Sequence, residues 1–217
     1  MRLKTVFACT MGLFMASALP AQTAPAPVEP AITTVPIVAP ALTPENTLHL
    51  DLSTGGRVSI QLRPDAAPAH VERIKTLARQ GFYNGIIFHR VIEGFMAQTG
   101  DPTGTGEGGS PLPDLKAEFN TLPHLRGAIS MARAELPDSA NSQFFIVFTP
   151  RFGLDRKYTV FGRVVSGMNF VDAIERGEPP LNPSRIVRAA IGSDNVAPPA
   201  PGTVAPVPPQ PAGTPQR

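Results

Sequence analysis

The stretch that decides the fold runs from Phe88 to Asp101 and reads FHRVIEGFMAQTGD. It places one arginine, Arg90, and one glutamine, Gln98, among large apolar side chains. Most enzyme sites combine acids, bases or nucleophiles, and this stretch has no obvious nucleophile, base pair or metal-ligand set. A guanidinium, an amide and an apolar wall instead favour a reaction in which no covalent bond is made or broken.

One target that suits Arg90 is the nitrogen of a prolyl amide. In the planar amide this nitrogen gives its lone pair to resonance, so it accepts hydrogen bonds poorly. When the bond twists, resonance is lost and the nitrogen becomes an acceptor. A donor held there would bind the transition state better than the substrate, as catalysis requires. Taken alone, however, an arginine at a strand end is usually a surface charge or half of an ion pair.

Composition divides the 217-residue chain into one domain and two tails. Most of the 26 prolines gather toward the two ends, where alanine, threonine and valine fill the spaces. Such stretches bury too little apolar surface to offset chain entropy. We therefore expect a disordered Pro/Ala-rich linker over residues 22–44 and a disordered Pro-rich tail over 196–217. Residues 45–195 form one domain, long enough for a sizeable core.

The first 21 residues have the parts of a secretory signal peptide. Arg2 and Lys4 supply the positive start, residues 6–16 are mostly apolar, and small residues follow. The chain is therefore expected to be periplasmic or secreted, without stable membrane insertion after cleavage; an uncleaved membrane anchor is the alternative. Cys9, the only cysteine, lies inside this segment, so the mature chain would have no thiol.

Charge and motifs argue against several other function classes. The formal net charge of +2 is small and the basic residues are scattered, so binding to nucleic acid is not expected. The four histidines show no metal-ligand spacing, and neither a metal nor a cofactor is expected. Residues 104–109 read GTGEGG, a letter-by-letter match to a dinucleotide fingerprint. The Ser-Pro-Leu-Pro that follows cannot begin the required helix, so we interpret this run as a loop beside a groove.

A hydrolase is a further enzyme class to weigh. Ser130, Ser142, His89 and Asp101 could be combined on paper into a catalytic triad. No nucleophile-elbow glycine pattern accompanies either serine. Only labelling by a mechanism-based serine reagent would support this class.

The hydrophobic pattern predicts a β-rich domain. Alternating apolar residues over 48–52 and 58–62, separated by a Gly-Gly pair, predict a hairpin. Many short strands with only two helices favour an antiparallel sheet closed into a barrel. The other predicted elements are helices over 65–80 and 168–176 and strands over 86–91, 127–131, 144–148, 159–165 and 185–191.

Phe95, Met96, Phe145 and Leu154 are candidate walls of an apolar pocket, although such residues are also typical of ordinary core. Neighbouring residues of an extended strand point to opposite faces. Phe95 and Met96 therefore cannot face one pocket from the same strand, and we expect a bend there, which Gly94 would allow.

A second motif accompanies the first, because residues 141–146 read NSQFFI. With GFMAQ at 94–98, SMARA at 130–134 and VFG at 160–162, the sequence resembles the cyclophilin family of peptidyl-prolyl cis-trans isomerases. This resemblance extends over nearly all of the domain. It implies a mainly β fold, a closed eight-stranded antiparallel β-barrel capped by two α-helices, with a proline-binding groove on its outer face.

The resemblance also implies roles for individual residues. Arg90 would be the catalytic arginine and Gln98 its positioning partner. The implied substrate-binding residues are Phe95, Met96, Phe145 and Leu154 in the proline pocket, Ala132, Arg133 and Ala134 along the peptide backbone, and Gln143 and Tyr158 on the groove wall.

Two positions depart from the family pattern. Gly153, preceded by Phe152, stands where many members have tryptophan or another large ring, and Tyr158 stands where many have histidine. The first departure puts binding of the drug cyclosporin in doubt. It leaves Arg90 and the pocket residues in place.

The resulting hypothesis is a peptidyl-prolyl cis-trans isomerase that assists the folding of exported proteins. Its partners would be proline-containing polypeptides that are unfolded or exposed. The alternative is a catalytically weak module, or a holdase chaperone, that binds proline peptides. Substitution of Arg90 by alanine separates the two, since only an isomerase has turnover to lose.

Overall fold

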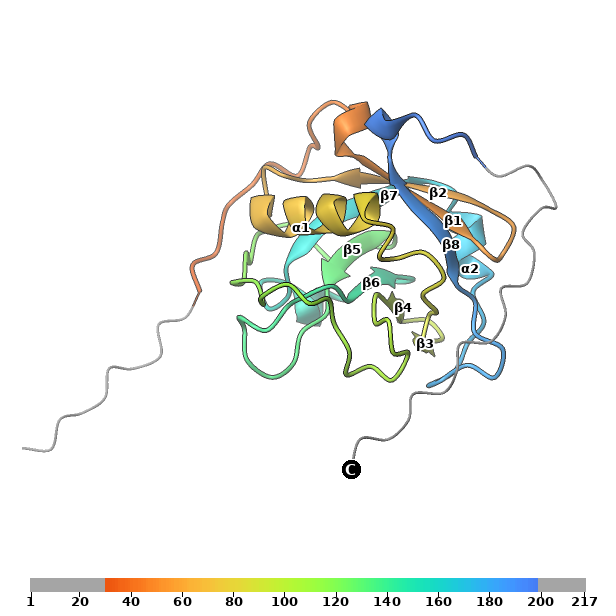
Figure 1. Ribbon diagram of the computed structural model, residues 1–217. Coiled ribbons are helices and arrows are strands. Elements are labelled where there is room, and N and C mark those ends of the chain that lie inside the picture. Colours follow the sequence, from red (N-terminus) through yellow and green to blue (C-terminus); the bar gives the residue numbers. More distant parts are fainter. Residues whose placement is uncertain (1–29, 199–217) are drawn as a thin grey trace, which may run out of the picture.

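The computed structural model describes residues 30–198, and its centre is one curled antiparallel sheet (Figure 1). The eight strands follow the order β3-β4-β6-β5-β7-β2-β1-β8. The elements are β1 (Thr47–Leu52), β2 (Gly56–Leu62), α1 (Pro68–Arg79), β3 (Arg90–Ile92), β4 (Met96–Thr99), β5 (Ala128–Met131), β6 (Phe144–Val147), β7 (Val160–Ser166), α2 (Met168–Asp172) and β8 (Ile186–Ile191), with short 3₁₀ helices η1 (Pro44–Asn46), η2 (Phe152–Leu154) and η3 (Gly192–Asp194).

The predicted hairpin is formed by β1 and β2. Leu48 lies opposite Ile60 and Leu50 opposite Val58, and all four side chains are buried in the main core. Gly55 makes the turn with a φ of +104°, a conformation that favours glycine. The alternation of apolar residues thus sets which face of the hairpin is buried.

Helix α1 packs against β8 through one apolar stripe. Val71, Ile74 and Leu77 are buried, and the chain leaves the helix before Gly81, whose φ is +71°. Helix α2 is shorter than the predicted 168–176, because the chain turns away after Asp172 and the Arg176 guanidinium donates hydrogen bonds to the Asp172 and Ile174 carbonyls. Within residues 30–198, no helix has the length and apolar character needed to cross a membrane.

The prediction of a closed barrel is wrong, because the sheet forms an open half-barrel with β3 and β8 as its edges. The outer edge of β3 pairs with the loop before β8 rather than with β8 itself: Val91 and Gly177 exchange two backbone hydrogen bonds of 2.8 and 2.9 Å. The strand predicted over 86–91 is correspondingly reduced. Ile87 makes only an isolated bridge with Arg185.

The described part of the predicted disordered linker, residues 30–44, lies along the domain. The Thr33 N–H donates to the Phe119 carbonyl at 2.7 Å, and Val35 is buried in a small apolar cluster. Arg63 Nη2 donates to the Pro36 carbonyl at 2.8 Å, and Gln61 Nε2 donates to the Pro40 carbonyl at 2.6 Å. Proline carbonyls remain acceptors although proline has no N–H, so a Pro-rich segment can still be bound in place. The predicted signal peptide and the C-terminal tail from residue 199 lie outside the described residues.

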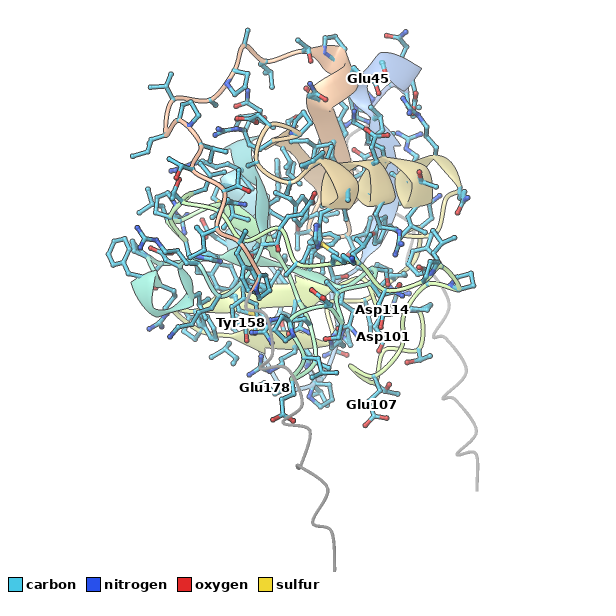
Figure 2. All side chains as sticks on the ribbon, turned by 90° about the vertical axis from the view of Figure 1, so that its left-hand side faces the viewer. Glu45, Asp101, Glu107, Asp114, Tyr158 and Glu178 are labelled. Carbon is cyan, nitrogen blue, oxygen red and sulfur yellow. The ribbon has the colours of Figure 1, made fainter. Side chains whose placement is uncertain are left out.

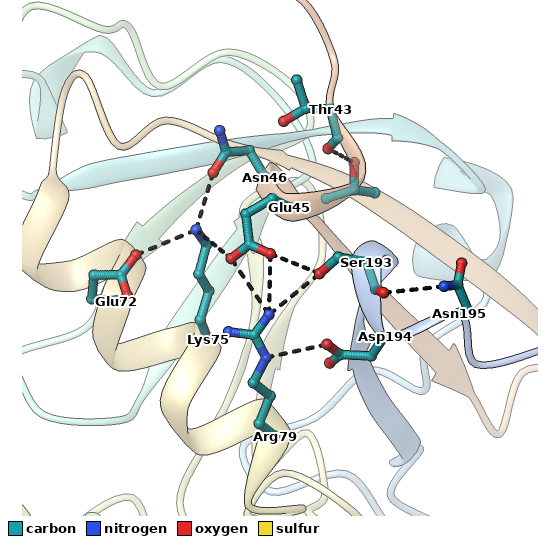
Figure 3. Close-up of polar contacts among 10 residues, drawn as sticks. Thr43, Glu45, Asn46, Glu72, Lys75, Arg79, Ser193, Asp194 and Asn195 are labelled. Carbon is teal, nitrogen blue, oxygen red and sulfur yellow. Dashed lines mark hydrogen bonds and ion pairs between the residues drawn. The ribbon is translucent and has the colours of Figure 1, made fainter.

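The two ends of the core meet beside α1 (Figure 3). Glu45 of η1 forms ion pairs with Lys75 and Arg79 of α1, and it accepts a 2.7 Å hydrogen bond from the Ser193 hydroxyl of η3. Hydrogen bonds from Ser193 and Lys75 lower the pKa of Glu45 to about 2. We call Glu45, Lys75, Arg79 and Ser193 the end clamp.

Candidate active site

Arg90 lies at the first residue of β3, opposite Gln98 of β4. Its side chain is 44% exposed, and its Nε donates a 2.8 Å hydrogen bond to Oε2 of Glu178, which is 50% exposed. Glu178 reaches Arg90 because the preceding residue, Gly177, pairs with Val91 of the same strand. The carboxylate contacts Nε, which leaves the two terminal nitrogens of the guanidinium available to another acceptor.

Glu178 is the residue that sequence reasoning missed. The sequence shows only that Glu178 is an acidic residue followed by two prolines. Because it lies 88 positions after Arg90, no local pattern links the two. Gln98 was expected to position Arg90, but its side-chain Nε2 donates at 2.9 Å to Oε1 of Gln143. Gln143 in turn donates to the carbonyls of Gly106 and Gly108. The two glutamines therefore connect the sheet to the glycine-rich loop.

The predicted site residues line two neighbouring cavities. The apolar one, of about 120 Å³, is lined by Arg90, Phe95, Met96, Gln98, Ala132, Arg133, Phe145, Leu154 and Tyr158. The second, of about 560 Å³, shares Gln98, Ala132 and Arg133 with the first and adds Ala134 and Gln143. The structure thus brings together all eleven residues that the resemblance implied, from the strands β3, β4 and β6, the 3₁₀ helix η2 and three loops.

The expected bend lies between β3 and β4. Gly94 has a φ of +62°, Phe95 lies in the turn, and Met96 begins β4. Met96 is buried, whereas Phe95 is only partly buried. The turn is what lets two neighbouring residues line one pocket.

The pocket wall at Phe145 rests on a buried histidine. The His124 ring stacks against the Phe145 ring with centroids 6.2 Å apart and 16° between their planes. Its Nδ1 lies 2.8 Å from Asp155 Oδ1 and its Nε2 lies 3.1 Å from Ser130 Oγ. Burial lowers the pKa of His124 by more than Asp155 raises it, so the ring is neutral near pH 7.

This Ser-His-Asp order does not make a hydrolase site. Ser130 and His124 are fully buried beneath Phe145, so a scissile bond cannot reach the serine. Ser130 Oγ also donates to the Thr159 carbonyl at 3.0 Å. The combination weighed from the sequence does not assemble either. Within the described residues neither ring nitrogen of His89 has a hydrogen-bond partner, and Ser142 Oγ donates to the Gly100 carbonyl.

Asp101 organises the glycine-rich loop. It accepts hydrogen bonds from the Thr103 N–H and hydroxyl, both at 2.7 Å, and from the Gly106 N–H at 2.6 Å. Burial raises the pKa of Asp101, but these hydrogen bonds outweigh it and leave the pKa below its usual range. No helix follows the run over residues 104–109, as expected for a loop rather than a dinucleotide fingerprint. Figure 2 shows Asp101, Asp114 and Glu107 gathered on one side of the molecule, apart from Tyr158 and Glu178.

Arg133 closes the opposite wall. Its guanidinium carbon lies 4.8 Å from the centroid of the Tyr158 ring, and its nitrogens donate to the Ala134 and Lys157 carbonyls. The Tyr158 ring in turn meets Phe145 edge to face at 5.9 Å. Arg133 is thus bound to the wall, whereas the terminal nitrogens of Arg90 make no hydrogen bond or ion pair to any residue between 30 and 198.

Comparison with known proteins agrees with this arrangement. The family described as cyclophilin type peptidyl-prolyl cis-trans isomerase/CLD matches residues 49–191. The chain belongs to this family. The enzyme is therefore an isomerase of prolyl peptide bonds, as the sequence motifs predicted.

Relatives extend the comparison. A probable peptidyl-prolyl cis-trans isomerase of Brucella suis is 49% identical over 172 residues, which cover 72% of this chain and 87% of the relative. Peptidyl-prolyl cis-trans isomerase B of Bacillus subtilis is 45% identical over 129 residues, covering 58% and 89%. Among solved structures, a cyclophilin from Hirschia baltica is similar with a TM-score of 0.66 and 30% identity, covering 70% of this chain and 76% of that one. A cyclophilin-type isomerase of Cryptosporidium parvum, crystallised in the presence of the dipeptide Ala-Pro, has a TM-score of 0.63 and 28% identity, covering 67% and 98%.

Proposed function

We propose that the enzyme isomerises X-Pro bonds of exported polypeptides, with the proline ring in the apolar cavity and Arg90 beside the prolyl nitrogen. The observation that carries this is the position of a half-exposed guanidinium at the rim of that cavity. Proline-containing peptides as ligands also find support in the Cryptosporidium relative, which was crystallised in the presence of Ala-Pro.

The chemistry follows from the twisted amide. Rotation about the X-Pro bond removes resonance, and the nitrogen then accepts a hydrogen bond from a terminal nitrogen of Arg90. The uncatalysed barrier is about 18–20 kcal/mol, and a millionfold acceleration needs about 8 kcal/mol. A charge-assisted hydrogen bond supplies a few kcal/mol of this stabilisation. Holding the ring between Met96 and Phe145, out of water, contributes further.

Glu178 and the two glutamines would have supporting roles. The carboxylate of Glu178 restricts rotation of the Arg90 guanidinium by holding Nε. Gln143, fixed by the loop carbonyls and by Gln98, lies beside residues 132–134, where we place the peptide backbone. These residues would hold the substrate while Arg90 acts on it.

An exported location rests on the sequence of residues 1–21, with its positive start, apolar run and small residues. A role in the folding of exported proteins follows, since their X-Pro bonds isomerise in tens to hundreds of seconds without catalysis. The full gene expressed in a Gram-negative host, followed by cell fractionation, tests the location. Recovery of an N-terminally shortened chain in the periplasm or medium is expected, and an uncleaved chain in the membrane would contradict it.

Proline-limited isomerisation of a reporter peptide tests the assignment of Arg90. The full chain should accelerate isomerisation, and Arg90→Ala should abolish most of the acceleration while peptide still binds. Arg163→Ala is a matched control, because Arg163 is exposed on β7 and lies outside the apolar cavity. Peptide binding without acceleration by either the wild type or Arg90→Ala would point to a binding module or holdase instead, and equal acceleration by both would contradict the assignment of Arg90.

A further inference from the structure

A third, open cleft lies beside the apolar cavity that we propose as the proline pocket. It has a volume of about 650 Å³, and its lining includes Ile92, Phe95, Arg151, Phe152, Gly153 and Leu154. Phe95 and Leu154 also line the proposed proline pocket, so the two cavities are adjacent. Ile92 is two residues beyond Arg90 on β3, and alternate residues of a strand share a face. Ile92 and the proposed catalytic Arg90 therefore lie on the same face of β3.

The cleft is open because residue 153 has no side chain. A Cβ built on Gly153 would meet no atom within 4 Å, and its φ lies outside the left-handed region. Neither backbone strain nor crowding therefore requires a glycine at this position. A Cβ could stand there without meeting another atom, and its absence leaves room beside the pocket.

The walls of the cleft are flat and aromatic. Phe152 is 64% exposed, an unusual state for a large apolar ring. The Arg151 guanidinium carbon lies 5.0 Å from the centroid of the Phe95 ring, and Arg151 Nη2 donates to the Gly94 carbonyl at 2.7 Å. The guanidinium is thus held over one ring with a second ring nearby. Rings and guanidinium planes both attract a further aromatic ring.

We propose that this cleft binds the aromatic side chain of a residue that flanks the proline in the substrate. It would be the residue on the side away from segment 132–134, since that segment borders the cavity at the other end of the groove. This inference rests on the proposed proline pocket, because the cleft is placed relative to it. The enzyme would then prefer X-Pro bonds with an aromatic neighbour.

The aromatic side chain would come from another polypeptide. Residues 22–44 and 196–217 contain no phenylalanine, tyrosine or tryptophan. The chain's own Pro-rich ends therefore contain proline but no aromatic ring for the cleft. Client polypeptides with an aromatic residue next to proline would have an advantage over these ends.

The test compares kcat/KM for three reporter peptides that carry glycine on both sides of proline, phenylalanine before it, or phenylalanine after it. The proteins are the full chain, Phe152→Ala and Gly153→Asp, and the matched control is Val165→Ala, an exposed apolar residue on β7 outside the cleft. For each protein we take the ratio of kcat/KM for a phenylalanine peptide to kcat/KM for the glycine peptide. The uncatalysed rates of the peptides are the same for all proteins, so differences in this ratio come from the protein. Thermal melts establish that each variant is folded.

We expect the wild type to favour one phenylalanine peptide about two- to tenfold, as for an aromatic pair. Phe152→Ala and Gly153→Asp should both reduce this ratio, and Val165→Ala should retain it. A ratio near one in the wild type, or one that both cleft variants retain, would overturn the inference. If the wild type fails to accelerate even the glycine peptide, the proposed catalytic pocket itself is wrong, which separates the two failures.

Discussion

The two ends of the groove differ in how their walls are held. At the Gln143 end, side-chain amides are bound in series from Gln98 through Gln143 to the carbonyls of the glycine-rich loop. At the Gly153 end, an exposed Phe152 ring and one guanidinium border open space. A hydrogen-bonded wall fixes geometry, and an open apolar wall accepts variable shapes. One end is therefore suited to the peptide backbone and the other to side chains.

Arg90, between the two ends, should show the largest effect. Arg90→Ala removes the donor to the twisted nitrogen, and loss of one such donor costs about a hundred- to a thousandfold in turnover. Proline-limited refolding or a reporter-peptide assay measures it. Arg90→Lys keeps the charge but loses the planar fork, so it should recover little activity. Full recovery by lysine would mean that charge alone suffices and that the fork geometry is irrelevant.

The Gln143 end comes next in expected effect. Gln143→Ala breaks the connection between β4, β6 and the loop, and we expect kcat/KM to fall about tenfold, equivalent to roughly 1.4 kcal/mol. Stopped-flow assays with longer peptides, which extend along segment 132–134, should show a larger loss than assays with a dipeptide. An equal loss of kcat/KM for both peptide lengths would contradict the proposal that the Gln143 end binds the backbone of the substrate.

Glu178 should have a smaller effect. Exposed ion pairs contribute about 0.2–1 kcal/mol, so Glu178→Gln should reduce kcat/KM by at most about fivefold. Added salt should weaken the wild type toward the variant, because screening acts on the same pair. The fall should appear mainly in kcat, since Glu178 acts through Arg90.

Glu93→Gln is the matched control for Glu178. Glu93 forms an exposed 2.7 Å ion pair with Arg176, also next to β3, without contacting Arg90. If both substitutions change kcat/KM equally, Glu178 has no special role in positioning Arg90.

Substitutions in the end clamp should change the stability of the protein but not its kcat/KM. The pKa of Glu45 is about 2 in the folded protein and 4.5 ordinarily, so the stabilisation is present above pH 4.5 and is lost as pH falls toward 2. Glu45→Gln should lower the free energy of unfolding at pH 7 by less than about 1 kcal/mol, because the side chain is half exposed. Urea unfolding between pH 3 and 7 should show the difference shrinking below pH 4.5. Glu72→Gln, which removes another ion pair of Lys75, is the matched control. A change in kcat/KM in either variant would contradict the separation of the end clamp from the groove.

Local patterns predicted the parts of the fold that local chemistry determines. The β1–β2 hairpin follows from alternation around Gly55, and α1 follows from its apolar stripe. The bend at Gly94 follows from two neighbouring pocket residues. The motifs around Arg90 and Gln143 also indicated residues that the structure brings together.

What escaped prediction depends on contacts between distant residues. The barrel stays open because Val91 pairs with Gly177, and the same pairing brings Glu178 to Arg90. Neither follows from any pattern within a strand or helix. Likewise, the packing of residues 30–44 depends on Gln61 and Arg63, whose donors find proline carbonyls that composition alone assigns to a disordered linker.

The meeting of η1 and η3 has a consequence for how this core can be joined to other chains. A polypeptide that enters at Glu45 leaves again near Ser193, 2.7 Å from it at the closest atoms. Figure 2 shows Glu45 at the end of the molecule away from Tyr158 and Glu178. Insertions succeed where the ends of a domain are adjacent and exposed. The core could thus be inserted into a surface loop of a host protein. Both connections to the host would lie at the same end of the core, and the groove would face solvent at the opposite end.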